Sequence, residues 1–238
     1  MRDNNIYDFS SDKIYIFALV IDSSGSMSEH SNDVIQGLEM YRKSFENFPE
    51  ANSIAVSISQ FDDEFHPGDF CRIGDFSSEY YTGGGTALHY SIVKGGEHLI
   101  EYNKKVTEKT GCIPISTLII FSDGEPCGDS MSESDSMRML SKLNAAGINT
   151  VFVAFGRAIR SEFGKKLGFM CTIDVDNEER LTNFLGVELS KSCKEQSKSM
   201  KSLGSNFFSS AVGNSEGYSQ ATTQALEDND WFTDIDDI

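Results

Sequence analysis

Basic residues are scarce in this chain, and their scarcity excludes several classes of function. Lys and Arg number 20 against 37 Asp and Glu, which gives a formal net charge of −17. A surface this acidic repels phosphates, so we expect no nucleic acid and no anionic membrane among its partners. The same charge raises the local concentration of cations near carboxylate clusters.

Long apolar runs and paired cysteines are missing as well. No segment approaches the roughly twenty apolar residues that a membrane-spanning helix needs. The first ten residues include Arg2, Asp3 and Asp8, so they do not resemble a secretory signal peptide. The 5 cysteines show no C-x-x-C spacing, which indicates free thiols in a reducing compartment. We therefore expect a soluble, cytoplasmic protein.

Strand-like and helix-like patterns alternate along most of the chain. Strands are predicted at 14–21, 53–61, 115–121, 148–155 and 170–174, with an edge strand or hairpin arm within 65–73. Helices are predicted at 34–48, after Thr86, and at 132–146, 161–167 and 177–194. Such alternation predicts an α/β fold, namely a doubly wound, mostly parallel six-stranded sheet with helices on both faces and one short antiparallel edge strand.

Two predicted helices carry details that a structure can check. Gly95 and Gly96 weaken the middle of the helix after the glycine-rich segment by about 1 kcal/mol each, so we expect them to permit close packing on the sheet. In the next helix, we expect Met137, Leu140 and Leu143 to form the inward-facing stripe.

The first predicted strand ends in a cluster of oxygen-bearing side chains. An apolar run leads directly to Asp22, and hydroxyls follow at Ser24 and Ser26 around Gly25. In open α/β sheets, ligands bind at the carboxyl ends of the strands. Donors that are all oxygen suit Mg²⁺ or a similar hard cation better than zinc or copper.

Two later segments direct further oxygens to the same edge. Three glycines at 83–85 precede Thr86, which is predicted to lie beside a helix N-terminus. The run 117–121, apolar after Thr117, ends in Ser-Asp-Gly, which places Asp123 at the end of a second buried strand. Each segment alone could be an ordinary turn or strand-end cap, but their combination predicts one shared metal site.

Together these segments resemble the von Willebrand factor A (VWA) family and its metal-ion-dependent adhesion site (MIDAS). Asp22, Ser24 and Ser26 match the family's D-x-S-x-S loop, Thr86 its threonine, and Asp123 its second aspartate. The resemblance implies direct metal coordination by Ser24, Ser26 and often Thr86. It implies that Asp22 and Asp123 commonly act through water.

The resemblance extends over about residues 14–192, and its motif style is most similar to single-domain bacterial proteins of tellurite-resistance type. It implies a binding module, an adaptor or scaffold, rather than an enzyme. The cation, Mg²⁺ or alternatively Mn²⁺ or Ca²⁺, would accept an Asp or Glu of a protein partner. We expect loop side chains such as Met27, Glu29, Tyr81 and Glu125 to set the specificity of that contact. Proteins of this type are encoded beside protein kinases and phosphatases in bacterial stress or defence systems, which implies such partners here.

Enzymatic interpretations of the same residues lack required groups. A haloacid-dehalogenase-type phosphatase needs a second aspartate where this chain has Ser24. The chain shows no nucleophile elbow, no phosphate-binding Gly-Lys-Ser/Thr and no dinucleotide fingerprint at these loops. The alternative that stays open is a metal-dependent hydrolase or phosphatase accessory using the same site.

Composition divides the chain into an N-terminal extension (1–12), a VWA-like domain (13–196) and a Ser/Gly-rich linker with an acidic-aromatic tail (197–238). Segment 226–238 carries six carboxylates and no basic residue around the single tryptophan, Trp231. It is either a solvated, disordered segment or a peptide that docks on a partner or on the chain's own metal site.

Overall fold

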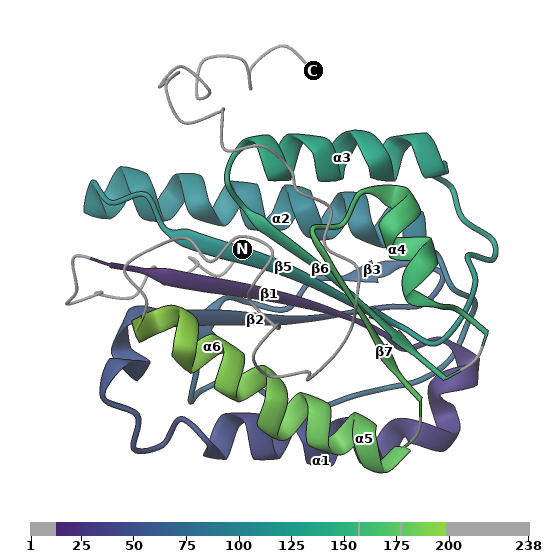
Figure 1. Ribbon diagram of the computed structural model, residues 1–238, viewed down its shortest axis with the longest axis horizontal. Coiled ribbons are helices and arrows are strands. Elements are labelled where there is room, and N and C mark those ends of the chain that lie inside the picture. The colour runs from purple at the N-terminus through teal and green to yellow at the C-terminus, as the bar shows by residue number, and fades with distance from the viewer. Residues whose placement is uncertain (1–12, 157, 177, 199–238) are drawn as a thin grey trace.

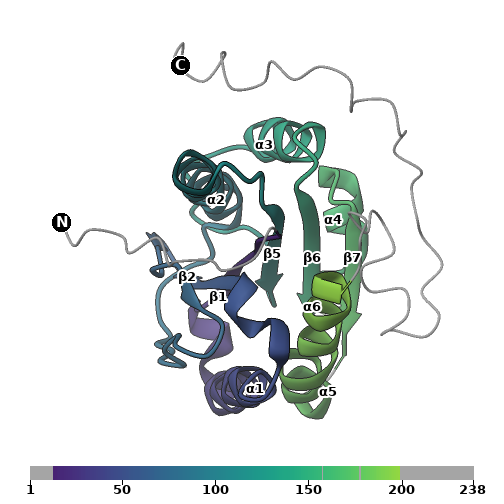
Figure 2. The ribbon, with the colours of Figure 1, turned by 90° about the vertical axis from the view of Figure 1, so that its left-hand side faces the viewer.

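The computed structural model describes residues 13–156, 158–176 and 178–198, so the predictions for segments 1–12 and 199–238 lie outside the described residues. A twisted sheet lies between two layers of helices (Figure 1). One face is covered by α1 (Ser31–Lys43), α5 (Glu178–Asn183) and α6 (Leu189–Lys198). The other is covered by α2 (Leu88–Thr110), α3 (Glu133–Ala145) and α4 (Ser161–Leu167), as the end view shows (Figure 2).

Parallel strands form the body of the sheet: β1 (Tyr15–Asp22), β2 (Ile54–Phe61), β5 (Ile115–Ser122), β6 (Asn149–Phe155) and β7 (Cys171–Val175). Their order is β2-β1-β5-β6-β7, so the topology switches direction beside β1. The short strands β3 (Phe65–His66) and β4 (Cys71–Arg72) both pair antiparallel with β2. The predicted doubly wound, mostly parallel sheet with a short antiparallel edge is confirmed.

The edge contains two strands rather than one because Gly68 interrupts it. Ser57 Oγ donates to the Gly68 carbonyl at 2.8 Å, and the Gly68 N–H donates to Ser59 Oγ at 3.1 Å. A β-carbon on Gly68 would lie 2.1 Å from the Ile58 carbonyl oxygen. Serine hydroxyls of β2 therefore form hydrogen bonds with both the carbonyl and the N–H of Gly68, at a position where only glycine fits. With the edge divided into β3 and β4, the sheet has seven strands instead of the six predicted.

The central strand β1 is buried on both faces, as its continuous apolar run predicts. Phe17 and Leu19 belong to the core under α1, α5 and α6, whereas Ile16 and Val20 belong to the core under α2, α3 and α4. A strand with its two faces in separate cores cannot shift register without losing both, so the end of β1 is firmly fixed.

The glycine pair of α2 packs closely on its neighbours, but only Gly95 packs on the sheet as predicted. A β-carbon on Gly95 would lie 2.8 Å from Val20 Cγ2 of β1, and one on Gly96 would lie 2.8 Å from Met139 of α3. Gly95 therefore lets the helix approach the sheet, and Gly96 lets α3 approach the helix. Any larger residue at either position would force the neighbouring element to move.

Two helix predictions need correction. Met137 is 43% exposed, and Met139 takes its place in the inward stripe with Leu140 and Leu143. Met137 and Met139 are two residues apart, so their side chains point about 200° apart around the helix. Helix α1, predicted to end at residue 48, ends at Lys43. Just after that end, Ser44 Oγ donates to the Tyr41 carbonyl and the chain turns.

The closing helix, predicted as one piece over 177–194, is divided by a π-helical turn at Phe184–Glu188. Gly186 lies in this turn, and a β-carbon there would be 2.6 Å from Met40 Cβ on α1. Val187, an apolar residue of this turn, is 45% exposed. A π-helical turn shifts the side chains within and after it around the helix axis, which accounts for the exposure of Val187. The 3.6-residue periodicity of the sequence does not predict such a turn.

Within the described residues, no helix is long and apolar enough to cross a membrane. All the cysteines are free thiols, with Cys171 and Cys193 buried and Cys127 exposed.

Candidate metal centre

Asp22, the last residue of β1, is fully buried at the carboxyl end of the sheet. The Ser24 N–H donates to Asp22 Oδ1 at 2.9 Å. The Ser122 hydroxyl, at the end of β5, donates to Asp22 Oδ2 at 2.6 Å. Both carboxylate oxygens are therefore held in place, one by the loop after β1 and the other by the end of β5.

The two serines of the first loop connect this buried carboxylate to the surface. Ser24 Oγ and Ser26 Oγ are 3.1 Å apart, and Ser26 Oγ donates to Asp123 Oδ1 at 2.9 Å. Ser26 is exposed and Asp123 is half-buried, whereas Asp22 and Ser24 are buried. The four side chains form one continuous row of oxygens from the core to solvent.

The glycine-rich loop is fastened to the first loop by backbone hydrogen bonds. The Gly83 N–H donates to the Ser23 carbonyl at 2.8 Å, and the Gly25 N–H donates to the Gly84 carbonyl at 3.1 Å. Gly84 has φ +67°, a conformation that other residues rarely adopt. These bonds bring the second loop alongside Asp22-Ser23-Ser24.

Thr86 is fixed by the third loop. Its N–H donates to the Cys127 carbonyl at 3.3 Å, and the Cys127 N–H donates to the Thr86 carbonyl at 2.9 Å. A β-carbon on Gly124 would lie 3.6 Å from Thr86 Oγ1, so this buried residue directs its hydroxyl toward the chain just after Asp123. That hydroxyl has no hydrogen-bond partner among the described residues, which suits an oxygen reserved for a ligand.

Burial dominates the electrostatics of the two aspartates. Desolvation raises the pKa of Asp22 to about 6, against the opposing hydrogen bonds from Ser122 and Ser24. Desolvation also raises the pKa of Asp123, partly offset by its hydrogen bond from Ser26. No lysine or arginine in the described segments pairs with either carboxylate. A buried and a half-buried acid that pair with no lysine or arginine of the described residues fit a site that takes a cation.

The donor set also limits which cation fits. The described residues contain no group of three or more His, Cys, Asp or Glu side chains able to hold a metal. The candidate donors are instead two carboxylates and three hydroxyls, on Asp22, Asp123, Ser24, Ser26 and Thr86. Oxygen donors of this kind fit Mg²⁺, Mn²⁺ or Ca²⁺.

Three residues important to the site were not identified in the sequence. Ser122, adjacent to Asp123, orients Asp22, and Tyr80 donates its hydroxyl to the Asp22 carbonyl. Asp129 accepts hydrogen bonds from the His89 and Tyr90 N–H groups and so caps α2 from outside the helix. Ser122 could have been found from its place in Ser-Asp-Gly, but the other two depend on long-range contacts.

One rim prediction is wrong. Met27, expected among the loop side chains that set partner specificity, is fully buried in the core beneath the first loop. Glu29 and Glu125 are exposed, and Tyr81 is 72% exposed, so these three remain available on the loops around the site.

The described residues adopt an α/β fold like that of VWA domains. No protein-family model matches the chain, and no curated protein matches it. Among solved structures, the pilus adhesin SpaC from Lactobacillus rhamnosus GG aligns with a TM-score of 0.62 and 14% identity, over 77% of this chain and 30% of SpaC.

Two further solved structures contain metals by their own descriptions. Proximal thread matrix protein 1 from the mussel byssus, with a zinc-occupied MIDAS motif, aligns with a TM-score of 0.52 and 14% identity, over 76% of this chain and 46% of that protein. Manganese-loaded TRAP from Plasmodium vivax aligns with a TM-score of 0.50 and 15% identity, over 73% and 72%. At such identities the likeness shows the fold alone. The chain spans less than half the length of the adhesin and of the byssus protein.

Proposed function

We propose that this protein is a metal-dependent binding module. Asp22, Ser24, Ser26, Thr86 and Asp123 would hold one divalent cation at the carboxyl edge of the sheet. The observation that carries the proposal is the hydrogen-bonded row from Asp22 to Asp123, which is buried at one end, open at the other and paired with no lysine or arginine of the described residues. The metal-loaded VWA-type structures of other proteins support the same assignment.

The chain's own residues would perform distinct tasks. Asp22 supplies buried negative charge, and Ser122 and Ser24 fix its orientation. The hydroxyls of Ser24, Ser26 and Thr86 supply neutral oxygens that leave the charge of the ion incompletely neutralised. When bound, the cation supplies an electrophilic centre that attracts an oxygen anion.

We propose that this anion is an Asp or Glu side chain of a protein partner. Ser26 and Asp123 lie at the open end of the row, so an incoming carboxylate would approach beside them. The exposed side chains of Glu29, Tyr81 and Glu125 would contact the surface around that carboxylate and select among partners. Mg²⁺ is the proposed ion, with Mn²⁺ and Ca²⁺ as alternatives.

The biological setting is proposed from motif resemblance alone. It is a cytoplasmic adaptor in a bacterial tellurite-resistance, stress or defence system, with kinase and phosphatase partners. The test is affinity capture from native lysate with Mg²⁺ and with chelator, comparing the natural chain with Ser24→Ala. A kinase or phosphatase retained only by the natural chain with Mg²⁺ is the expected result. Identical captures under both conditions would contradict it.

Metal binding is tested by calorimetric titration of the full chain with MgCl₂ and MnCl₂. We expect binding heat with the natural chain and none with Asp22→Asn, which removes the buried charge but keeps the side-chain shape. Asp69→Asn is the matched control, because it removes one exposed carboxylate away from the site. Equal heats for the two variants, or no heat with the natural chain for either ion, would overturn the proposal.

A further inference from the structure

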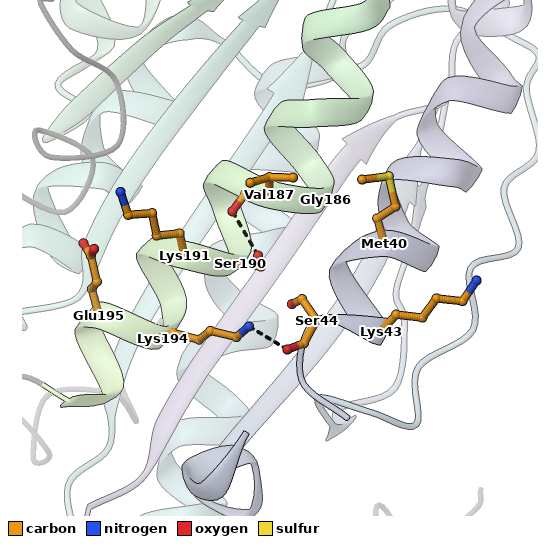
Figure 3. Close-up of a pocket in the computed structure, with 9 residues that line it drawn as sticks. All are labelled: Met40, Lys43, Ser44, Gly186, Val187, Ser190, Lys191, Lys194 and Glu195. Atoms are coloured by element: carbon orange, nitrogen blue, oxygen red, sulfur yellow. Dashed lines mark hydrogen bonds between the residues drawn. The ribbon is translucent and has the colours of Figure 1, made fainter. Parts of the chain in front are cut away.

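A groove of about 610 Å³ runs between the C-terminal half of α1 and the closing helix, on the face of the sheet that carries α5 and α6 (Figure 3). Its walls come from Met40, Lys43 and Ser44 on one side and from segment 186–195 on the other. Gly186 brings the two walls together, since a β-carbon there would touch Met40. The groove is a built feature of the helix packing, distinct from the metal site.

The groove combines apolar and cationic side chains. Met40 and Val187 are 42% and 45% exposed, which is unusual for apolar residues on facing elements. Lys43, Lys191 and Lys194 accompany them, with Glu195 as the only acid in the lining. In a chain of net charge −17, three lysines around one apolar surface are a marked local excess of positive charge.

The lysines are not used equally by the fold. Lys194 donates to the Ser44 carbonyl at 2.6 Å and lies over the Phe45 ring at 4.9 Å, so it is fixed in the wall. Lys43 and Lys191 are exposed and form no ion pair within the described residues. Figure 3 shows their side chains extending away from the backbone on opposite sides of the groove. Both are available to a ligand of negative charge.

One segment of the chain has the complementary chemistry. Residues 226–238 carry six carboxylates, no basic residue, and Trp231, Phe232, Ile235 and Ile238 between them. An acidic peptide with interleaved apolar side chains matches a groove of apolar floor and cationic rim. Segment 1–12 carries only three acids, Asp3, Asp8 and Asp12, together with the basic Arg2. Charge therefore favours the C-terminal segment as the occupant of the groove.

The connecting chain is long enough. Helix α6 ends at Lys198, and the groove extends back along this helix. A Ser/Gly-rich coil spanning 199–225 would have an r.m.s. end-to-end distance of about 28 Å. Helix α6 itself is only about 15 Å long at 1.5 Å per residue, so the segment can return to the groove without strain.

We propose that segment 226–238 docks in cis into the groove between α1 and α6, with Trp231 against Met40 and Val187 and the carboxylates beside Lys43 and Lys191. This contact differs from masking of the metal site. The groove lies at the C-terminal end of α1, whereas the metal loop precedes the N-terminal end of the same helix. The docked tail leaves Ser26 and Asp123 accessible.

Trp231 is the only tryptophan, so the intrinsic fluorescence of the full chain reports this contact directly. We expect a blue-shifted emission in the natural chain. In Lys43→Glu/Lys191→Glu we expect a red shift and about threefold stronger acrylamide quenching, because an aromatic anchor leaves its pocket. High salt should shift the natural chain in the same direction.

The matched control is Lys104→Glu/Lys142→Glu, which makes the same charge change on α2 and α3, across the sheet. Circular dichroism checks that each variant is folded. The proposal requires that the control variant keep the emission of the natural chain. It also requires that the emission of the natural chain not change with protein concentration or with EDTA.

Four results would overturn the proposal. A fully solvent-exposed Trp231 in the natural chain would show an undocked tail. Equal shifts in both lysine pairs would show a non-specific charge effect. Loss of the signal in EDTA would place the tail on the metal, and loss on dilution would place it on a second copy.

Discussion

The Ser122 hydroxyl donates to Asp22 Oδ2 at 2.6 Å and so joins the ends of two adjacent strands at the buried acid of the site. The partners are 100 positions apart in sequence but neighbours across the β1–β5 pairing. This bond determines how the carboxylate is aimed before any cation arrives. It therefore gives a way to test orientation separately from charge.

Ser122→Ala should weaken Mg²⁺ binding without abolishing it. The variant retains all five proposed ligand side chains but leaves Asp22 Oδ2 without its side-chain donor. Loss of such a supporting hydrogen bond typically lowers metal affinity about 10–100-fold. Calorimetric titration measures the change, with the exposed Ser130→Ala as the control. An unchanged affinity would show that Ser122 has no positioning role.

Asp22→Asn should stabilise the metal-free protein while removing its response to Mg²⁺. Burial raises the pKa of Asp22 from 3.8 to about 6, so the ionised acid destabilises the fold at neutral pH by about 1–3 kcal/mol. Asparagine carries no charge to desolvate. Chemical denaturation at pH 7.5 in EDTA and in Mg²⁺ separates the two effects. A less stable variant in EDTA would contradict the prediction.

The stability difference between the natural chain and Asp22→Asn should depend on pH. In the folded protein the pKa of Asp22 lies above its unfolded value, so the folded state binds more protons between about pH 4 and pH 6. The stabilising contribution of protonated Asp22 is complete at low pH and is lost as pH rises through about 6. In chelator, the variant should therefore gain on the natural chain across this window. A difference independent of pH would contradict the raised pKa.

Gly85→Ala should disturb the glycine-rich loop through one specific clash. A β-carbon at this position would lie 2.6 Å from Asp63 Oδ1. We expect a loss of at most about 1 kcal/mol in the free energy of unfolding, because the exposed Asp63 side chain can rotate away. Asp63→Ala should restore most of it in the double variant, because Asp63 is exposed and its carboxylate is the clashing group. A double variant no more stable than Gly85→Ala would place the strain elsewhere.

Local patterns in the sequence are sufficient for the strands and for the residues at their ends. The run before Asp22 is apolar at every position because both faces of β1 are buried, and the run before Asp123 is apolar for the same reason. Hydrophobic periodicity does not predict which residues are buried where packing against a neighbouring element determines the local structure. Met139 replaces Met137 in the stripe of α3, and a π-helical turn interrupts the closing helix at Gly186, where Met40 of α1 approaches.

The sequence by itself determined that Asp22 ends one buried strand and that Asp123 follows directly after another, because hydrophobic burial is encoded residue by residue along each run. Only the tertiary structure decided that Ser26 bonds Asp123 and that Thr86 sits against Gly124, because these contacts depend on strand order and on the backbone bonds between loops. The same holds for the groove beside α6. Its two walls come from segments about 150 residues apart, and only their packing brings Lys43 opposite Lys191.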